Sequence, residues 1–395
     1  MIPERLRSDR ARLHLFPDSS HSTGCDRERL SRAAYFLALL IGCIAVALGL
    51  ASALLAATGA PPGVVWDAML KGSVGSTAAL GTTLNYTALV LTVAIGTCIA
   101  FRAGLFNIGQ EGQFTIGGIA GTAVGLALPF RGILAIVVIV VAAAVGGALW
   151  ALFPAYLKLH RGVSEVVTTL LMDFVAFQLL SFVVNKPYLL GERLPKGSLL
   201  SGQPQSNLLP GADLLPSLAE GVGYRLQITI VVAIALALVS SFLIARSRWG
   251  LRVRASGFNP HIMQRMGIRR WQIGGGALLI SGAFAGLAGG FLLTGTVLRI
   301  QGGVSTGVVG SFSDNFGWEG LLVALVARFR PSIAIPVAFL FGALRAGGEV
   351  LASTGVDSSI VGVVQALVVL AVTIPTVVAQ VHAQRTRAKS LLDYA

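Results

Sequence analysis

Apolar segments long enough to cross a lipid bilayer recur along this chain. A spanning helix needs about 20 mostly apolar residues. Of the 395 residues, 54 % are hydrophobic and only 12 % are charged, whereas a soluble protein carries about 25 % charged residues. The sequence therefore predicts an all-α polytopic membrane protein with about ten transmembrane spans. We place them at residues 33–57, 78–101, 107–129, 132–157, 163–184, 226–245, 273–297, 315–330, 332–351 and 360–381.

The distribution of Lys and Arg predicts the orientation of the spans. Ten spans put both termini on one side, which then carries 22 Lys and Arg residues against seven on the other, with one more inside a span. Positive residues accumulate on the cytoplasmic side of membrane proteins, so we expect an N-in/C-in topology. The net charge of +13 then reflects this topology, and we expect no nucleic-acid partner.

The same segments predict the domain organisation. Residues 1–32 form a charged cytoplasmic N-terminal tail, and residues 382–395 form a basic cytoplasmic tail. Residues 33–381 form the transmembrane domain. It contains an outer loop, 185–225, and a strongly basic cytoplasmic loop, 246–272.

The pattern Asn-x-Gly-x-Glu-Gly occurs twice, beginning at Asn107 and at Asn315. Asn favours helix N-termini, a carboxylate suits the positive end of the helix dipole, and glycine permits close approach. Each copy therefore predicts the start of a broken helix, with Glu111 or Glu319 in its first turn. Chance repetition of so short a pattern is the alternative.

The predicted topology places the two copies in opposite orientations. Asn107 opens the third span at its cytoplasmic end, and Asn315 opens the eighth span at its outer end. Spans two to five and seven to ten would then form two inverted pseudo-repeats, which is typical of transporters with a substrate path between the halves. Irregular backbone at membrane depth is tolerated where it is buried in protein or lines a polar cavity. We therefore expect both copies to lie along the path.

A charged pair lies within the ninth predicted span. Arg345 and Glu349 are four residues apart, so they share one face of a helix. Ionisable residues inside a membrane are costly and often mark functional pathways. We therefore expect both residues to line or flank the path. The alternative is a mutual structural ion pair.

The basic cytoplasmic loop contains a short predicted helix. Asn259 followed by Pro260 is a strong helix start, and Gly267 is a plausible stop. So short a helix is marginal alone in water, and a Met-rich apolar face favours docking of a partner. A basic loop lying on anionic lipid is the alternative. The apolar face consists of Ile262, Met263 and Met266.

The sequence lacks motifs for catalysis or energy conversion. It has no G-x-x-x-x-G-K-[ST] and no H-E-x-x-H motif. Its three Cys are too few and scattered for a metal site, and its five His lie in tails or cytoplasmic loops. We therefore expect no enzyme, no metal and no cofactor in this chain, with the energy source on another subunit. An ion-coupled secondary transporter with inverted repeats is the alternative, although it leaves the docking helix unexplained.

The sequence resembles the permease subunits of bacterial ABC importers of the simple-sugar and nucleoside type, within the branched-chain amino acid and ribose permease group. The resemblance covers roughly residues 35–380. Four stretches carry it: RAGLFNIGQEGQFTIGGIAG from Arg102, GVSEVVTTLLMDF from Gly162, GLRVRASGFNPHIMQRMGI from Gly250 and FGALRAGGEVL from Phe341.

This resemblance implies a translocation subunit in the bacterial cytoplasmic membrane that imports a small polar solute, either a nucleoside or a simple sugar. It implies an ATPase subunit that binds ATP, an external solute-binding protein, and a second permease, identical or different. Membrane lipid would surround the complex. The ATPase would dock on the coupling helix of the cytoplasmic loop. The residues expected there are Gly257, Asn259, Pro260, Ile262, Met263, Met266 and Gly267.

Overall fold

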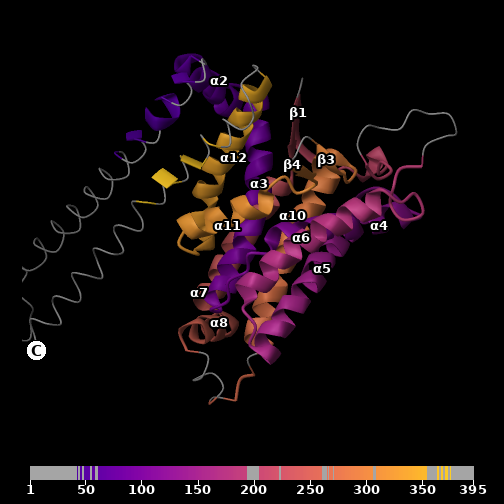
Figure 1. Ribbon diagram of the computed structural model, residues 1–395, viewed down its shortest axis with the longest axis vertical. Coiled ribbons are helices and arrows are strands. Elements are labelled where there is room, and N and C mark those ends of the chain that lie inside the picture. The colour runs from indigo at the N-terminus through magenta and orange to yellow at the C-terminus, as the bar shows by residue number, and fades with distance from the viewer. Residues whose placement is uncertain are drawn as a thin grey trace, which may run out of the picture. The chain divides into compact units, whose positions relative to one another are not determined.

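The computed structural model (Figure 1) divides the chain into two compact units, Leu54–Gln365 and a second unit of Met1–Ala53 with Ala366–Ala395. Most of the described residues belong to the first unit. The described residues are 42, 45–46, 49–53, 56–57, 61–193, 204–221, 224–259, 265, 267–269, 271–305, 308–353, 363, 366–367, 370–371 and 374.

Helices dominate this unit, as the apolar segments predict. Three π-helical turns extend them, at Leu157–Arg161, Trp271–Gly275 and Leu293–Val297. The α-helices are α2 (Pro62–Val74), α3 (Thr77–Arg102), α4 (Gln110–Ala127), α5 (Ile133–Tyr156), α6 (Glu165–Val184), α7 (Thr229–Arg246), α8 (Arg248–Phe258), α10 (Gly276–Leu292), α11 (Phe316–Val326) and α12 (Pro331–Ser353).

Within the described part of the chain, six helical segments are long and apolar enough to cross a membrane. They are Thr77–Arg102, Ile133–Arg161, Glu165–Val184, Thr229–Arg246, Trp271–Val297 and Pro331–Val350. These confirm a mostly helical, multi-pass architecture. The predicted spans 33–57 and 360–381 lie largely outside the described residues, so the count of ten spans and the N-in/C-in topology stay predictions.

The prediction of an all-α fold is wrong in detail, because two short antiparallel hairpins lie between the helices. In one hairpin β1 (Ser217–Gly221) pairs with β2 (Tyr224–Gln227). In the other β3 (Gly302–Ser305) pairs with β4 (Val308–Ser311), with Gly302 opposite Ser311. Strands of four or five residues are too short for a clear alternation of apolar and polar side chains.

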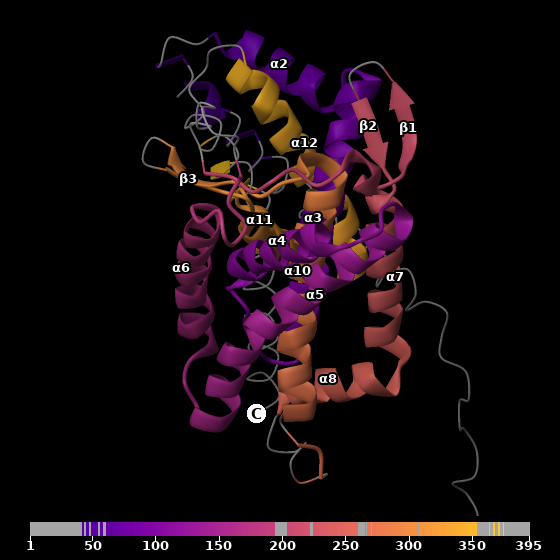
Figure 2. The same ribbon diagram turned by 90° about the vertical axis from the view of Figure 1, so that its right-hand side faces the viewer.

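The core of the unit is built around α3 and α10, whose apolar windows are mostly buried. α3 packs against α7, α10, α11 and α12, and α10 packs against α4 and α5. α5 and α10 approach so closely that a Cβ on Gly286 would lie 2.2 Å from the carbonyl oxygen of Ala143. Small residues allow such contacts between membrane helices. Figure 2 shows α6 and α7 on opposite sides of the group formed by α4, α5 and α10.

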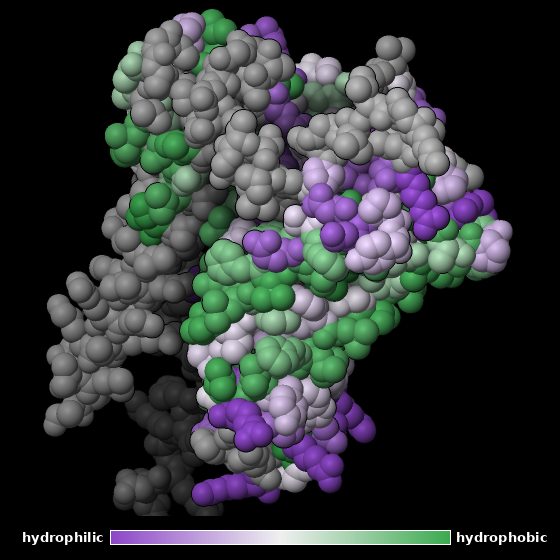
Figure 3. Space-filling view, turned by 45° about the vertical axis from the view of Figure 1, so that its right-hand side comes forward, coloured by the Kyte–Doolittle hydropathy of each residue, from purple (hydrophilic) through white to green (hydrophobic). Residues whose placement is uncertain are grey.

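Large apolar side chains cover the outer faces of α5, α6 and α7. Only a third of the apolar window of each of these helices is buried, and exposed examples are Val141, Leu171 and Phe242. Figure 3 shows hydrophobic residues forming a broad band between hydrophilic groups on one face. Exposed apolar surface of this extent suits contact with lipid or with another membrane subunit.

Candidate functional site

The first copy of the repeated pattern lies in the irregular segment that leads into α4. Asn107 is buried, and its Oδ1 accepts hydrogen bonds from the backbone N–H of Gly109 at 3.2 Å and from Nε2 of Gln113 at 3.1 Å. Its Nδ2 donates to Gln113 Oε1 at 2.8 Å and to Ser281 Oγ of α10 at 2.9 Å. Asn107 therefore fixes the start of α4 and ties it to the core.

The carboxylate of Glu111, in the first turn of α4, binds the N-terminus of α11. Its side chain is fully enclosed, with the residue 1 % exposed. Oε1 accepts from Ser313 Oγ at 2.5 Å and from the backbone N–H of Asn315 at 2.9 Å, and Oε2 accepts from the backbone N–H of Gly317 at 2.7 Å. An anion at a helix N-terminus satisfies unpaired N–H groups and the helix dipole together. The two copies of the pattern therefore meet, one capping the other.

The contact between the copies requires glycine at position 317. A Cβ there would lie 2.4 Å from the backbone nitrogen of Glu111, a distance that no side chain tolerates. Asn315, the N-cap of α11, has a left-handed backbone with φ of 68°, a conformation in which Asn is enriched among non-glycine residues. The backbone of the second copy is thus shaped to receive Glu111.

Arg345 of α12 binds the same end of α11. Its Nη1 donates to Glu319 Oε1 at 2.8 Å, and its Nη2 donates to the carbonyl oxygen of Asp314 at 2.9 Å and to the Asp314 carboxylate. The guanidinium carbon lies 4.0 Å from the ring centroid of Phe316. Because the Arg345 side chain is only 10 % exposed, these partners compensate a charge held out of water.

The alternative of a mutual ion pair between Arg345 and Glu349 is not supported by the ion pairs of the described residues, and the expectation that both line or flank the path stays a prediction. Among the ion pairs between described residues, those of Arg345 go to Asp314 and Glu319. Glu349 is exposed and accepts a hydrogen bond from the Tyr86 hydroxyl. The Tyr86 ring lies 5.3 Å from the Arg345 guanidinium, so Glu349 is at the edge of the cluster.

Sequence reasoning missed Asp173, which lies in α6 against the first copy. Its Oδ1 accepts from the backbone N–H of Gly112 at 2.8 Å, and the residue is 2 % exposed. Its Oδ2 has no hydrogen-bond partner among the described residues. The signal was present in the sequence, because Asp173 is the one carboxylate within the apolar run of the predicted span 163–184 apart from Glu165 at its start.

Six charged or amide residues therefore lie around the contact between the two copies of the pattern, some buried and some at its margin: Asn107, Glu111, Asp173, Asn315, Glu319 and Arg345. Glu111 is enclosed by its hydrogen-bond donors, whereas Asn315 is exposed. This arrangement holds the N-terminus of α11 in place, and the N–H groups that Glu111 binds would be free for a solute if α11 moved away from it.

The predicted coupling residues are only partly described. Asn259 directly follows α8 and has an extended backbone with φ of −154°, the conformation that an N-cap residue adopts. Gly267 has φ of 76°, and Gly257 lines a pocket beside the end of α3. Pro260, Ile262, Met263 and Met266 lie outside the described residues, so the coupling helix stays a prediction.

Residues 79–373 match the family of the branched-chain amino acid transport system, permease component. The chain belongs to this permease family. The resemblance drawn from the four sequence stretches is thereby confirmed, and the chain is a non-catalytic, multi-pass membrane subunit of an ABC transport system. In such systems ATP is bound by a separate ATPase subunit, and a binding protein serves the permease.

Three relatives of this permease illustrate the family. The guanosine ABC transporter permease NupP of Bacillus subtilis is 30 % identical over 339 residues, 84 % of this chain and 92 % of the relative. The glucose ABC transporter permease TsgB13 of Haloferax volcanii is 30 % identical over 290 residues, 71 % and 72 % of the two chains. The nucleoside ABC transporter permease NupB of Lactococcus lactis is 25 % identical over 347 residues, 86 % and 92 %. No solved structure matches the permease.

Proposed function

We propose that this permease is the translocation subunit of an ATP-driven importer of nucleosides, with simple sugars as the second candidate substrate. Relatives named for guanosine and for nucleosides align with 84 % and 86 % of the chain, whereas the glucose permease aligns with 71 %. The longer alignment favours nucleosides. The chain would lie in a bacterial cytoplasmic membrane with both termini inside, because Lys and Arg are concentrated on that side.

The observation that supports our proposal for the solute path is the contact between Glu111 and the N-terminus of α11. A helix N-terminus at membrane depth, held by a carboxylate from another helix, is the kind of broken-helix junction at which transporters bind solutes. We assign Asn107, Glu111, Asn315 and Glu319 to this path, with Arg345 beside them and Glu349 at its edge. Release of α11 from Glu111 would expose hydrogen-bonding groups to a polar solute.

The proposed complex contains three further proteins. An ATPase would dock on the predicted helix Asn259–Gly267, and an external binding protein would deliver the solute. A second permease, identical or different, would cover part of the apolar surface that α5, α6 and α7 leave exposed.

Reconstitution into proteoliposomes tests this function. The permease is combined with its ATPase, binding protein and second permease, and uptake of radiolabelled guanosine is measured with ATP inside the vesicles. We expect uptake to require ATP hydrolysis and to fail with an ATPase variant that cannot hydrolyse ATP. Unlabelled guanosine should reduce the uptake of labelled guanosine more strongly than glucose does. Uptake driven by an ion gradient through the permease alone would contradict the proposal, and better competition by glucose would move the assignment to sugars.

A further inference from the structure

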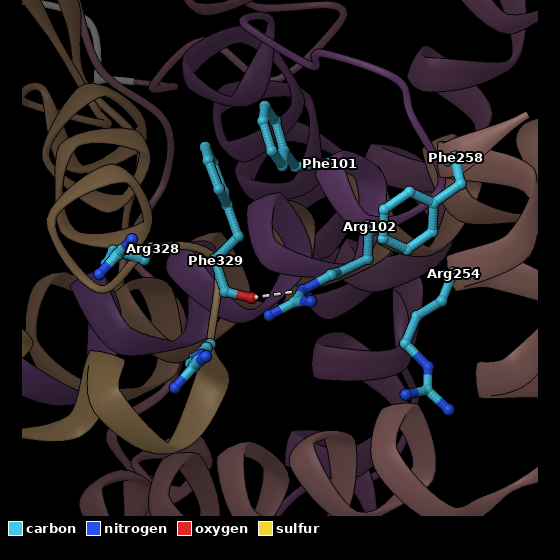
Figure 4. A pocket seen from close by; sticks show the side chains of 8 residues that line it. Phe101, Arg102, Arg254, Phe258, Arg328 and Phe329 are labelled. Atoms are coloured by element: carbon cyan, nitrogen blue, oxygen red, sulfur yellow. Dashed lines mark hydrogen bonds between the residues drawn. The ribbon is translucent and has the colours of Figure 1, made fainter. Parts of the chain in front are cut away.

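A second polar site lies at the opposite end of α11, away from the cluster around Glu111. Three segments that are distant in the sequence meet there: the last residues of α3, the last turn of α8, and the turn between α11 and α12. They enclose a pocket of about 380 Å³, shown in Figure 4. It lies on the side where Lys and Arg are concentrated, which the positive-inside rule assigns to the cytoplasm.

The walls of this pocket are fixed by specific contacts. Nε of Arg102 donates to the carbonyl oxygen of Phe329 at 3.0 Å, and the rings of Phe101 and Phe329 stack with centroids 3.4 Å apart and planes 10° apart. Arg328 and Phe329 both have φ of 54°, a left-handed conformation that non-glycine residues rarely adopt. A strained turn that persists in this way points to function.

The pocket is strongly cationic. No acidic residue lines it. Four arginines do, namely Arg102, Arg254, Arg328 and Arg330. Among the described residues, Arg102, Arg254 and Arg330 form no ion pair with a carboxylate. Like charges gathered at one place repel one another, and a bound anion would offset that repulsion. Arginine forks match phosphate oxygens in geometry as well as in charge.

An aromatic ring lies at the edge of the same pocket. Phe258, the last residue of α8, lines the pocket and is 90 % exposed. A phenyl ring in that position offers an open face on which a flat ring can stack, and base–aromatic stacking contributes about 1–3 kcal/mol. The pocket volume also falls in the range of about 300–1,000 Å³ typical of small-molecule sites.

We propose that this pocket is a nucleotide-binding site on the cytoplasmic side of the permease, with the phosphate among the arginines and the base stacked on Phe258. The proposal rests on the proposed orientation of the chain but not on its proposed substrate. A bound nucleotide would join α8, which leads into the coupling loop, to the turn that follows α11.

Binding to the purified full-length chain tests the proposal. The chain is placed in nanodiscs of phosphatidylcholine without the ATPase, and guanosine 5′-monophosphate, guanosine and inorganic phosphate are titrated by calorimetry. We expect the nucleotide to bind more tightly than phosphate, and Arg330→Gln to weaken it about tenfold through loss of a charge-assisted hydrogen bond. Arg252→Gln, an exposed arginine of α8 outside the pocket, is the matched control and should bind as wild type. Phe258→Leu should weaken the nucleotide several-fold and leave phosphate unchanged.

Several results would overturn this assignment. Equal binding of guanosine and its monophosphate would place the ligand in the substrate path, and equal binding of phosphate and the nucleotide would leave no role for Phe258. Loss of nucleotide binding when phosphatidylglycerol replaces half of the lipid would identify a lipid headgroup as the occupant. Equal affinities of Arg330→Gln and Arg252→Gln, with unchanged melting temperatures, would remove the site from this pocket.

Discussion

At the scale of single residues, the carboxylate of Glu111 has the most demanding surroundings in the described structure. It accepts hydrogen bonds from the Ser313 hydroxyl and from the backbone N–H groups of Asn315 and Gly317. Glu111 is therefore the acceptor for three donors at the start of α11. A buried donor left without an acceptor costs about 1–3 kcal/mol.

We expect Glu111→Ala to lower the free energy of unfolding by about 2 kcal/mol or more, because it leaves the buried donors of Ser313 and Gly317 without this acceptor. Uptake per permease molecule should fall more than tenfold. Glu111→Gln keeps the volume and one acceptor oxygen, so its effect should be intermediate. Melting of the detergent-solubilised protein and uptake in the same cells measure both effects.

The control is Glu220→Gln, since Glu220 is an exposed carboxylate of β1 whose ion pair with Arg225 lies at the surface. Surface pairs contribute about 0–1 kcal/mol, so this variant should behave as wild type. Wild-type melting and uptake of Glu111→Ala would remove the capping role.

Gly317 gives a second prediction at this scale. A methyl group there would lie 2.4 Å from the Glu111 backbone nitrogen, whereas a Cβ on Gly276 of α10 would meet nothing within 4 Å. We therefore expect Gly317→Ala to lower the melting temperature and uptake, and Gly276→Ala to leave both unchanged or slightly raise stability. Both are helical glycines, so they differ mainly in the space available. Similar results for the two variants would mean that α4 and α11 do not touch at this point.

At the scale of elements, Arg345 links α12 to the start of α11. Its ion pairs go to Asp314 and Glu319, and Glu349 has a different partner. We expect Arg345→Glu to abolish uptake. Adding Glu319→Arg should restore part of it, because that exchange keeps opposite charges facing each other. Adding Glu349→Arg instead should restore nothing.

Arg345→Lys refines this prediction. Lysine keeps the charge but lacks the planar fork that reaches two acceptors, so we expect uptake between that of wild type and Arg345→Glu. Uptake is measured beside membrane abundance to separate transport from folding. Rescue by Glu349→Arg, and not by Glu319→Arg, would return the residue to a pair within α12.

The sequence was sufficient to predict most helices, because long apolar runs leave few alternatives in a membrane. It also predicted the short starts of α4 and α11 from their shared pattern. It did not predict α2, α8 or the hairpins. α8 contains Arg248, Arg252 and Arg254 among its eleven residues. Because of these charges, we assigned the segment to a cytoplasmic loop and not to a helix. The cap that Ser247 provides, accepting from Gly250 N–H at 2.9 Å, was a readable signal.

Of the six residues of the candidate site, sequence reasoning singled out all but Asp173, but it did not predict the contacts between them. Glu111 and Asn315 are 204 residues apart, and no local pattern records which donors a buried carboxylate receives. The spacing of Arg345 and Glu349 correctly predicts that they lie on one helix. Spacing along α12 carries no information about α11, whose Glu319 is the ion-pair partner of Arg345. Both contacts that were not predicted join residues far apart in the chain, and a single sequence does not show which distant residues touch.

At the scale of the whole molecule, this permease is one subunit of an ABC transport system. Its core of α3 and α10 is buried, while α5, α6 and α7 present apolar faces outward. Solute enters from one side, and the energy for transport arrives from an ATPase on the other. The segment Asn259–Gly267 is our candidate for the contact that joins them.

We expect Met263→Glu combined with Met266→Glu to abolish uptake by preventing association of the ATPase. Burial of each apolar side chain contributes roughly 1.5–3 kcal/mol, enough for two of them to decide whether the partner docks. Membrane insertion should be unaffected, since no span is altered. Co-purification of the ATPase, measured beside uptake in the same cells, checks the prediction.

Arg265→Glu is the matched control, because it changes the net charge by the same two units at a position off the predicted apolar face. It should retain the ATPase. Loss of the ATPase in both variants, or in neither, would favour the alternative in which this loop lies on anionic lipid.

The short length of α11 has a consequence for how the protein is made. Its eleven residues extend about 16 Å at 1.5 Å per residue, roughly half of the ~30 Å hydrocarbon core. Such a helix cannot be inserted as an independent span, and its first N–H groups have no acceptor in lipid. Glu111 precedes them in the chain, so ribosomal synthesis delivers the acceptor before the helix that needs it. For these two segments the order along the polypeptide is then also the order of assembly, and a chain synthesised without α4 would leave the first N–H groups of α11 without this acceptor.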